Sequence, residues 1–445
     1  MNHVLLRNFR EMPEIAVSAA GITIRSADGR DVIDGSGGAA VACLGHGHPA
    51  VIDAIRQQIE RVSYVHTGFY MAEPVEELAE RLVGHEPGGL THAYFVSSGS
   101  EAMEAALKLS RQYALEIGEP QRDHFIGRRQ SYHGNTLGAL AVGGNQVRRP
   151  PYEAILSPNF SHVSPCFPYR DQREGESDAA YVKRLADELE AEFQRVGPDR
   201  VIAFVAEPVV GATLGCAPAL PGYFKAVREI CDHHGALLIF DEVMCGLGRT
   251  GTLHAWEQEG LTPDIQTIAK GLGGGYQPIG GILVAGRVMA ALRSGSGLHR
   301  HGHTYAAHPV ACAAALAVQK VIADEGLVAR VAKRGRLLAE ILRHRFGDHP
   351  HVGDIRGRGL FWAIELVEDR ATKAPFSPQV AMNGRVKAAA FHRGLACYPV
   401  GGTIDGVSGD HVILAPPYIA TEAEIELIVD RLSAGLEDAL NSADA

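Results

Sequence analysis

The chain has 445 residues, of which 46% are hydrophobic and 21% charged, and both fractions are ordinary for a globular protein. This length favours one large domain with a smaller companion. The net charge of -10, from 52 acidic and 42 basic residues, argues against a nucleic-acid partner, which would need a basic face. It also argues against binding to an anionic membrane surface.

The cysteines and the apolar runs bear on the cellular compartment. Seven dispersed cysteines without a CxxC pair predict reduced thiols, and their spacing disfavours zinc, so we expect no metal. The first residues lack the apolar core of a signal peptide. No apolar run is long enough to span a bilayer, and we therefore expect a soluble, cytoplasmic protein.

The first part of the chain predicts a hairpin, helices and a strand in that order. Apolar and polar residues alternate around Asp28 and Gly29, which is typical of a hairpin. Helical spacing extends over residues 50–82. A short strand at 93–96 then leads into the small-residue turn SSGSE and an amphipathic helix.

The middle of the chain repeats this order. Buried strands are predicted at 201–208 and 236–243, with a helix between them that begins at Pro221 and ends at Gly235. The segment PDIQTIAKGLGGG predicts another strand, ending in Lys270 and a glycine-rich loop. This alternation indicates an α/β fold whose mostly parallel sheet is covered on both faces. Functional groups then belong at the carboxyl ends of the strands.

Two further regions complete the pattern. Residues 170–197 are charged and helical in pattern, and we expect a solvated excursion there. After His308 the sequence predicts alanine-rich helices, strand-like segments around Gly359, and a last helix capped by Thr421. We expect this later part to form the smaller domain.

Asp241 and Lys270 are the most informative residues. Each stands at the end of an apolar strand, where a charge is costly unless it is paired or functional. Taken singly, the aspartate could cap a turn and the lysine could point to water. Their joint placement beside further polar motifs favours a functional pair.

Two of those motifs are a small-residue turn and an aromatic segment. The turn from Ser97 to Glu101 precedes a helix, and backbone amides at a helix N-terminus can hold a phosphate; an ordinary capped helix start is the alternative. Tyr132 and His133 follow another strand, where an aromatic ring can cover a flat cofactor or simply be buried in a loop. A lysine, a carboxylate, a phosphate anchor and an aromatic face are what pyridoxal 5'-phosphate requires.

In combination these motifs resemble the class III aminotransferases, of the fold-type-I pyridoxal-phosphate superfamily. The resemblance runs from about Gly21 to about Leu432. It is carried by DGSGGAAVACLGHGHP, SSGSEAMEAALKLSR, SYHGNT, AEPVVG, LLIFDEVMCGLGRTG, IAKGLGGGYQPIGG and GHTYAAHPVACAAAL. It implies a mostly parallel central sheet with helices on both faces plus a smaller α+β domain. The expected division is an N-terminal segment 1–48 that joins the small domain, a large cofactor-binding domain 49–308, and a small domain 309–445.

The resemblance also implies the residues that surround the cofactor ring. Lys270 would bind the cofactor covalently and carry protons during catalysis. Asp241 would hold the pyridine nitrogen. Val243 would pack beneath the ring, and Tyr132 would stack on its other face with His133 beside it. Because free lysine has a pKa of about 10.4, Lys270 needs a lowered pKa to act as a base.

Further residues are implied at the phosphate and at the substrate side. Gly99 and Ser100 would bind the phosphate, and Glu207 would lie near the cofactor's phenolic oxygen. Thr304 would reach the phosphate of the neighbouring subunit's cofactor, which implies a homodimer with shared active sites or a tetramer. Arg249 would only support its loop.

The expected reaction is a ping-pong transamination. An amino group would move from a primary amine or omega-amino acid to a 2-oxo acid, pyruvate or 2-oxoglutarate. The alternatives are an aminomutase or racemase with the same cofactor, a nicotinamide dehydrogenase using the GLGGGY loop, and a catalytically silent relative. The absence of a helix start with the right spacing at that loop disfavours the dehydrogenase, and the retained lysine, aspartate and phosphate turn disfavour the silent relative.

The sequence departs from the family in two places. Many relatives carry an arginine shortly before the last strand for the acceptor's carboxylate, whereas GGTIDGVSGDHVILAPPY has none. Arg170 is a candidate replacement, with a solvated arginine as the alternative. Several relatives place a tryptophan where GGAAVACLG has only small residues, which indicates a roomier pocket. Residues 64–70 would line that pocket or pack at a helix end.

Overall fold

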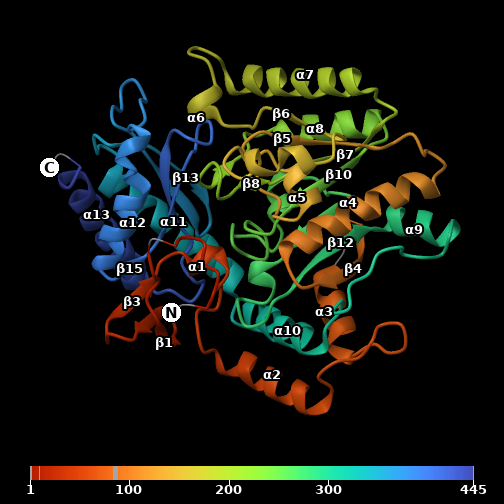
Figure 1. Cartoon of the computed structure of the whole chain (residues 1–445), viewed down its shortest axis with the longest axis horizontal. Helices are drawn as coiled ribbons and strands as arrows, with labels where there is room; N and C mark the ends of the chain where they lie inside the picture. The colour runs from red at the N-terminus through yellow and green to blue at the C-terminus, as the bar shows by residue number, and fades with distance from the viewer. Residues whose placement is uncertain (1–2, 10, 84–88, 444–445) are drawn as a thin grey trace.

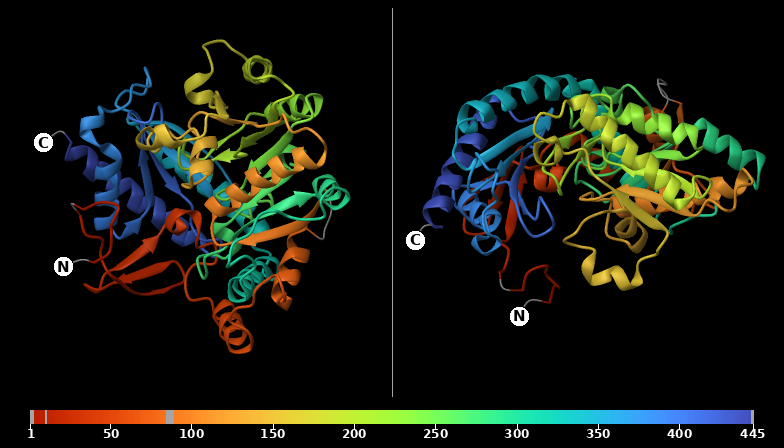
Figure 2. Two further views of the ribbon diagram at one scale, coloured as in Figure 1. Left: turned by 45° about the vertical axis from the view of Figure 1, so that its right-hand side comes forward. Right: turned by 90° about the horizontal axis from the view of Figure 1, so that it is seen from above.

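The computed structural model describes residues 3–9, 11–83 and 89–443. Two helix-bearing parts lie side by side (Figure 1). The larger part surrounds a seven-stranded sheet, and the smaller part contains the C-terminal helices together with the N-terminal strands. The views of Figure 2 show the same arrangement.

The large sheet is mostly parallel. In spatial order it consists of β4 (Leu90–Val96), β12 (Gly280–Ala285), β11 (Ile265–Ile268), β10 (Leu237–Asp241), β7 (Val201–Ala206), β5 (His124–Arg128) and β6 (Phe160–Val163). The strands from β11 to β6 are parallel to their neighbours, whereas β12 is antiparallel to both β4 and β11. The predicted strands therefore lie in one sheet, with β12 as its reversed member.

Helices cover both faces of this sheet because successive strand side chains point to opposite sides. In β10, Leu238 and Phe240 belong to the cluster packed by α3, α7 and α8, and Leu237 and Ile239 belong to the cluster packed by α4 and α9. Both sets are fully buried, so the strand is apolar throughout. The helices are α3 (Glu73–Val83), α4 (Gly99–Glu116), α7 (Asp178–Val196), α8 (Tyr223–His233) and α9 (Gly286–Ser294).

The expectation of a solvated excursion at residues 170–197 was wrong. This segment contains α7, which begins after the cap Ser177 and is amphipathic. One side of the helix is buried in the core through Tyr181, Leu185, Leu189 and Phe193. The charged residues form only its outer face, so the helix is a regular covering element of the sheet.

The smaller part has its own antiparallel sheet. Its order is β13 (Val352–Arg358), β14 (Phe361–Leu366), β17 (Asp410–Leu414) and β16 (Tyr398–Gly401). The helices α11 (Leu327–Phe346), α12 (Met382–His392) and α13 (Glu422–Asn441) pack on it in one apolar cluster. Thr421 caps α13, and with Glu424 it forms a capping box.

The N-terminal strands join this smaller part. The predicted hairpin is formed by β2 (Thr23–Ser26) and β3 (Asp31–Asp34), with β1 (Ala16–Ala20) beside β2. β3 pairs in parallel with β15 (Leu395–Ala396), which is far away in the sequence. The red and blue segments of Figures 1 and 2 lie together for this reason.

The remaining elements connect the two parts. α10 (Pro309–Asp324) packs on α2 (Pro49–Arg61) and α3, and its residues contribute to the apolar clusters of both parts. The division at 48 and 308 therefore stays a prediction. Short elements are α1 (Gly37–Ala40), α5 (Leu137–Val142), η1 (Pro150–Ile155), α6 (Pro168–Asp171), β8 (Val209–Val210), β9 (Ala217–Pro218), η2 (Ala255–Glu259), η3 (Lys270–Leu272) and η4 (Pro378–Val380).

The described residues contain neither a membrane-spanning helix nor a cluster of metal ligands. None of the helices in the described ranges is long and apolar enough to cross a lipid bilayer. No group of histidine, cysteine or acidic side chains within these ranges has an arrangement that could hold a metal ion.

Candidate active site

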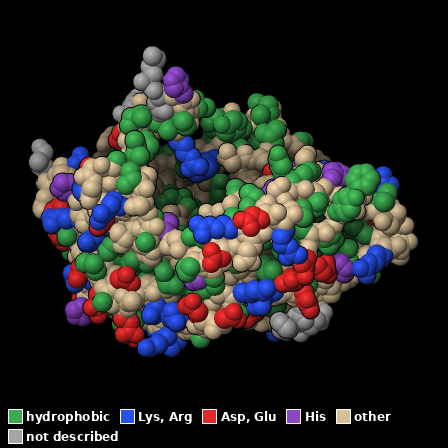
Figure 3. Space-filling model, turned by 90° about the horizontal axis from the view of Figure 1, so that it is seen from below, with side chains coloured by type: hydrophobic (Ala, Val, Ile, Leu, Met, Phe, Trp, Pro, Cys, Tyr) green, Lys and Arg blue, Asp and Glu red, His purple; other side chains and the backbone are tan. Residues whose placement is uncertain are grey.

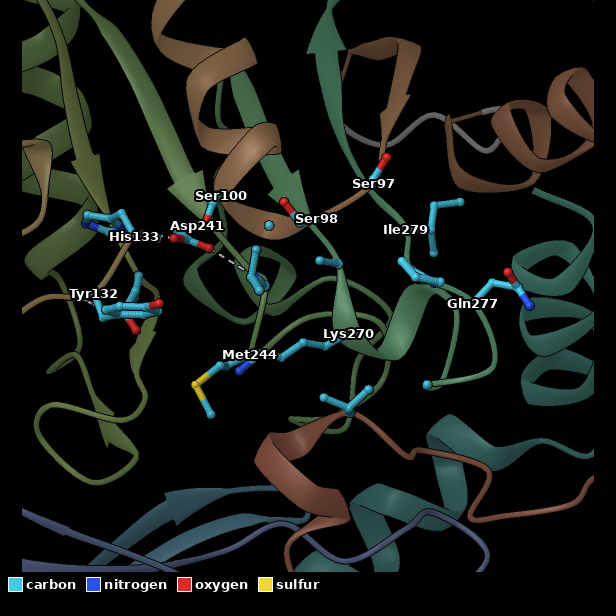
Figure 4. Close-up of a pocket in the computed structure, with 18 residues that line it drawn as sticks. Ser97, Ser98, Ser100, Tyr132, His133, Asp241, Met244, Lys270, Gln277 and Ile279 are labelled. Carbon is cyan, nitrogen blue, oxygen red and sulfur yellow. Dashed lines mark hydrogen bonds and ion pairs between the residues drawn. The ribbon is translucent and has the colours of Figure 1, made fainter. Parts of the chain in front are cut away.

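A cavity of about 410 Å³ lies where the chain leaves the carboxyl ends of the sheet strands, which is the usual place for a ligand in an α/β fold. Eight of the nine predicted site residues line it, from five separate segments of the chain. They are Gly99, Ser100, Tyr132, His133, Glu207, Asp241, Val243 and Lys270 (Figure 4). Figure 3 shows a hollowed face of the molecule with apolar side chains around it.

Asp241 ends β10 and is held on several sides. Its Oδ2 accepts a hydrogen bond from Nδ1 of His133 at 2.8 Å. Its Oδ1 accepts one from the backbone N–H of Val243 at 3.0 Å and one from the Thr267 hydroxyl at 3.1 Å. The residue is only 4% exposed. The carboxylate is thus fixed in orientation while it borders the cavity, as a partner for a ring nitrogen must be.

His133 supports Asp241 from behind. Its side chain is fully buried, and its Nε2 has no hydrogen-bond partner among the described residues. A buried polar atom without a partner is uncommon. Here it belongs to a residue that lines the cavity.

Glu207 follows β7 and ties two loops together. Its carboxylate accepts hydrogen bonds from the backbone N–H groups of Tyr132 at 3.1 Å and Gly211 at 2.9 Å. Burial raises the pKa of Glu207, and the nearby Asp241 acts in the same direction. A second buried carboxyl therefore stands beside Asp241 at the cavity wall.

Lys270 lies just beyond the end of β11 and lines the same cavity as these carboxyl groups (Figure 4). Its backbone φ of 46° is in the left-handed region, which is unusual for a residue with a side chain and is associated with functional sites. Burial lowers the pKa of Lys270 to about 8, against the opposing influence of Asp241 and Glu207. Within the described residues its ammonium group has no hydrogen bond or ion pair. The neutral, reactive amine is therefore more accessible near physiological pH than in an ordinary lysine.

The small-residue turn lies at the N-terminus of α4, as predicted. Ser98 is the cap and accepts a hydrogen bond from the Glu101 N–H at 3.2 Å. Ser100 accepts one from the Asn135 N–H at 3.0 Å. The turn is both a capped helix start and a wall of the cavity, so the two readings of the motif are compatible. Its backbone N–H groups and the positive end of α4 suit a phosphate.

The glycines of this region permit close packing. A Cβ on Gly99 would lie 3.1 Å from the Val243 side chain, so the turn and the residue expected beneath the ring are in direct contact. A Cβ on Gly280, in the adjacent β12, would lie 2.4 Å from the Ser98 carbonyl oxygen. Only glycine lets the strand and the turn approach this closely.

These residues fit pyridoxal 5'-phosphate. The lysine, the carboxylate, the phosphate turn and the aromatic ring of Tyr132 surround one cavity, whose volume suits a small-molecule ligand. His133, with its unpaired buried nitrogen, adds a further polar group to the site. The close packing at Gly99 and Gly280 gives the site its shape. When bound, this cofactor supplies an aldehyde for the lysine and a ring that withdraws electrons. The fold and the site together define a fold-type-I pyridoxal-phosphate enzyme.

Comparison with known proteins identifies the family. The family model described as Aminotransferase class-III matches residues 6–436. An uncharacterised aminotransferase of Schizosaccharomyces pombe is 51% identical over 432 residues, which cover 97% of this chain and 94% of that protein. The chain belongs to the class III aminotransferases, and its cofactor is accordingly pyridoxal 5'-phosphate.

Two solved structures support the same assignment. An (S)-enantioselective omega-transaminase from Thermomicrobium roseum has a TM-score of 0.92 and 35% identity, covering 99% of this chain and 96% of that one. The omega-transaminase from Pseudomonas jessenii, in complex with PMP, has a TM-score of 0.91 and 33% identity, covering 97% and 94%. The resemblance to fold-type-I transaminases is thus confirmed, and the dehydrogenase and the non-enzymatic alternatives are set aside.

Three predicted features lie elsewhere. Thr304 is exposed and does not line this cavity, so its expected role toward a second subunit stays a prediction. Arg170 is neither solvated nor at the cavity, because its guanidinium pairs with the buried Glu365 at 2.6 Å. Phe69 and Tyr70 are exposed at 83% and 69%, so in the single chain residues 64–70 do not line the cavity.

Some cavity residues were not singled out from the sequence. They include Val41, Met244 and Gln277. Each stands inside a motif that carried the family resemblance, but nothing in the motif distinguishes the one side chain that faces the cavity. Val41 belongs to the segment GGAAVACLG, so a small residue does border the cavity there. Arg249 has the structural role expected, since its Nη1 donates to the carbonyl oxygens of Leu360 and Pro416.

Proposed function

We propose that this aminotransferase transfers the amino group of a primary amine or omega-amino acid to a 2-oxo acid, pyruvate or 2-oxoglutarate. The observation that carries the proposal is that Lys270 and Asp241 line the same cavity. The pKa of Lys270 is lowered, and the Asp241 carboxylate is oriented by His133. The similarity to omega-transaminases supports a donor of this class.

The residues of this chain would divide the work as follows. Lys270 is the base that would take the proton from the carbon bearing the donor's nitrogen and deliver it to a carbon of the cofactor. Asp241, oriented by His133, keeps the ring nitrogen protonated. Glu207 holds the Tyr132 loop in place, and the N-terminus of α4 holds the phosphate through Gly99 and Ser100. Lys270 thereby acts on both half-reactions, as a ping-pong order requires.

The small residues at the N-terminal motif favour bulky donors. Val41, from the N-terminal motif in which several relatives carry a tryptophan, borders the cavity, and we propose that its side chain leaves room for a larger donor. We expect amines with an aromatic or branched substituent to react. A donor panel in which only the smallest amines react would contradict this expectation.

The first test is a transamination assay with a panel of amines and either pyruvate or 2-oxoglutarate. The absorption spectrum of the bound cofactor is recorded during the assay. Lys270→Ala should lose at least about 99.9% of turnover, in line with the loss of other catalytic bases that also bind covalently. Thermal unfolding of the variant verifies that it is folded. Residual activity of a tenth or more would overturn the role of Lys270.

The same assay addresses the alternative reaction. An aminomutase or racemase would consume the amine and change the cofactor's absorption, but it would not pass nitrogen to a separate acceptor. Formation of alanine from pyruvate, or of glutamate from 2-oxoglutarate, therefore supports the transaminase.

We also propose a homodimer in the cytoplasm. The expected partner role of Thr304, together with exposed apolar side chains at Phe69, Tyr70 and Tyr305, supports a second copy of this chain on that face. All seven cysteines are free thiols, which supports a reducing compartment.

A further inference from the structure

Arg148 lies against one of the cavity's walls. Its guanidinium carbon is 4.8 Å from the centre of the Tyr132 ring, and its Nη1 donates a hydrogen bond of 3.4 Å to the Tyr132 hydroxyl oxygen. Tyr132 itself lines the cavity. The arginine is half-buried and does not itself line the cavity, so its positive charge lies next to Tyr132, one residue removed from the cavity.

Among the described residues, this charge has no acidic partner. Across the part of the chain that the structure describes, no carboxylate forms an ion pair with Arg148, and its hydrogen bond to Tyr132 is long and to a neutral group. The neighbouring Arg149 differs, because its Nη1 donates to three carbonyl oxygens at the end of α5. Arg170 is neutralised by Glu365. Arg148 therefore retains both its charge and most of its five donors.

Arg148 is also next to the loop that lacks an arginine. A Cβ on Gly406 would lie 2.7 Å from the Cβ of Gln146 and 3.2 Å from the Val147 nitrogen, so the 402–409 loop packs on the residues just before Arg148. The Asp405 carboxylate of this loop accepts hydrogen bonds from the backbone N–H groups of Val407 and Ser408. Residues 402–409 contain no lysine or arginine. Arg148 supplies a cation from the adjacent segment.

We propose that Arg148 binds the carboxylate of the 2-oxo acid acceptor. The inference rests on the proposed function, since that function requires an acceptor that bears a carboxylate. A guanidinium can bind a carboxylate through two parallel hydrogen bonds. The stacking on Tyr132 gives the side chain a resting position when an uncharged amine occupies the site.

The test compares acceptors with and without the carboxylate. Pyruvate and propanal serve as acceptors for one uncharged amine donor, in steady-state kinetics of the wild type and of Arg148→Ala and Arg148→Lys. We expect Arg148→Ala to lower the ratio of kcat/KM for pyruvate to that for propanal by about 10- to 100-fold, the range of a charge-assisted hydrogen bond. Arg148→Lys should retain part of the preference, because it keeps the charge but not the fork.

A binding measurement complements the kinetics. Calorimetric titration with propanoate, which carries the carboxylate but cannot react, should show a similar loss of affinity in Arg148→Ala. Arg173→Ala removes an exposed loop arginine and is the matched control, with no change in the acceptor ratio or in propanoate affinity.

Two results would overturn the proposal. An unchanged acceptor ratio with unchanged propanoate affinity would exclude carboxylate binding, and an equal loss with both acceptors would reduce Arg148 to a support of Tyr132. A wild-type protein that aminates neither pyruvate nor 2-oxoglutarate would contradict the proposed function instead. In that case the propanoate titration still decides whether Arg148 binds a carboxylate.

Discussion

At the scale of single residues, burial shifts the pKa values of ionisable groups in and beside the site. Lys270 is surrounded by protein, which disfavours its ammonium form and lowers its pKa to about 8. Directly beyond Asp241, burial raises the pKa of Glu242 to about 8, and this carboxyl accepts hydrogen bonds from the N–H groups of Ala255 and Trp256. Two adjacent acids of the DEV motif thus have different surroundings, and only Asp241 borders the cavity.

The pKa of Lys270 predicts how the protein without cofactor captures pyridoxal 5'-phosphate. Only the neutral amine attacks an aldehyde, and a lowered pKa makes that form available at lower pH. We expect the capture rate to rise with pH, reach half of its maximum near pH 8 and level off above it. Stopped-flow absorption measures this rate. A rate that keeps rising to pH 10, as for an ordinary lysine with a pKa of about 10.4, would show that burial has not shifted this group.

At the scale of elements, the phosphate turn depends on how closely β12 approaches α4. Gly280 in β12 has no space for a side chain, because a Cβ would lie 2.4 Å from the Ser98 carbonyl oxygen. Backbone atoms, unlike the end of a flexible side chain, cannot move aside cheaply. The geometry of the turn is therefore set by a neighbouring strand from a distant part of the sequence.

This packing predicts the effect of one methyl group. Gly280→Ala should lower the free energy of unfolding by about 1–3 kcal/mol, the usual cost of overpacking, and should weaken retention of the cofactor. Thermal unfolding and equilibrium dialysis measure the two effects. Gly384→Ala is the matched control, because nothing lies within 4 Å of its added Cβ in α12. If Gly280→Ala retains the cofactor as well as the control does, the close contact between β12 and the turn at Ser98 does not shape the cofactor site.

At the scale of the whole molecule, one face remains apolar in the single chain. Tyr64 donates a hydrogen bond to the Thr304 carbonyl oxygen at 3.0 Å, and its ring meets that of Tyr305 edge to face. Phe69, Tyr70 and Met71 continue this surface with exposures of 67% to 83%. Apolar side chains gathered in this way favour a subunit interface.

Hybrid dimers test whether Thr304 acts in the partner's site. Lys270→Ala inactivates its own site, and Thr304→Ala would weaken cofactor binding in the neighbouring one. If Thr304 acts across the interface, a hybrid of the two variants has one intact site and recovers up to half of the wild-type activity. Refolding or coexpression of the variants, followed by cofactor retention and rate measurements, gives the result. A hybrid no more active than Thr304→Ala alone, or a monomer in sedimentation analysis, would refute the shared site.

The sequence by itself determined the elements and the chemical groups of this protein. Apolar runs such as LLIFD and the charged residues that end them predict strands and site residues together, because a charge at the end of a buried strand has few structural reasons to be there. The DEV and IAKGLGGG motifs likewise identified Asp241 and Lys270, and the structure places both at one cavity.

Only the tertiary structure decided which groups are free to act. The sequence cannot distinguish Arg148 from Arg170, because both stand in polar segments. In the fold, Glu365 of β14 pairs with Arg170, while the Arg148 guanidinium lies over the Tyr132 ring. Three further features were also decided only by the fold: the buried face of α7, the reversed strand β12 and the close contact of Gly280 with Ser98. They depend on contacts between distant segments, which local patterns do not contain.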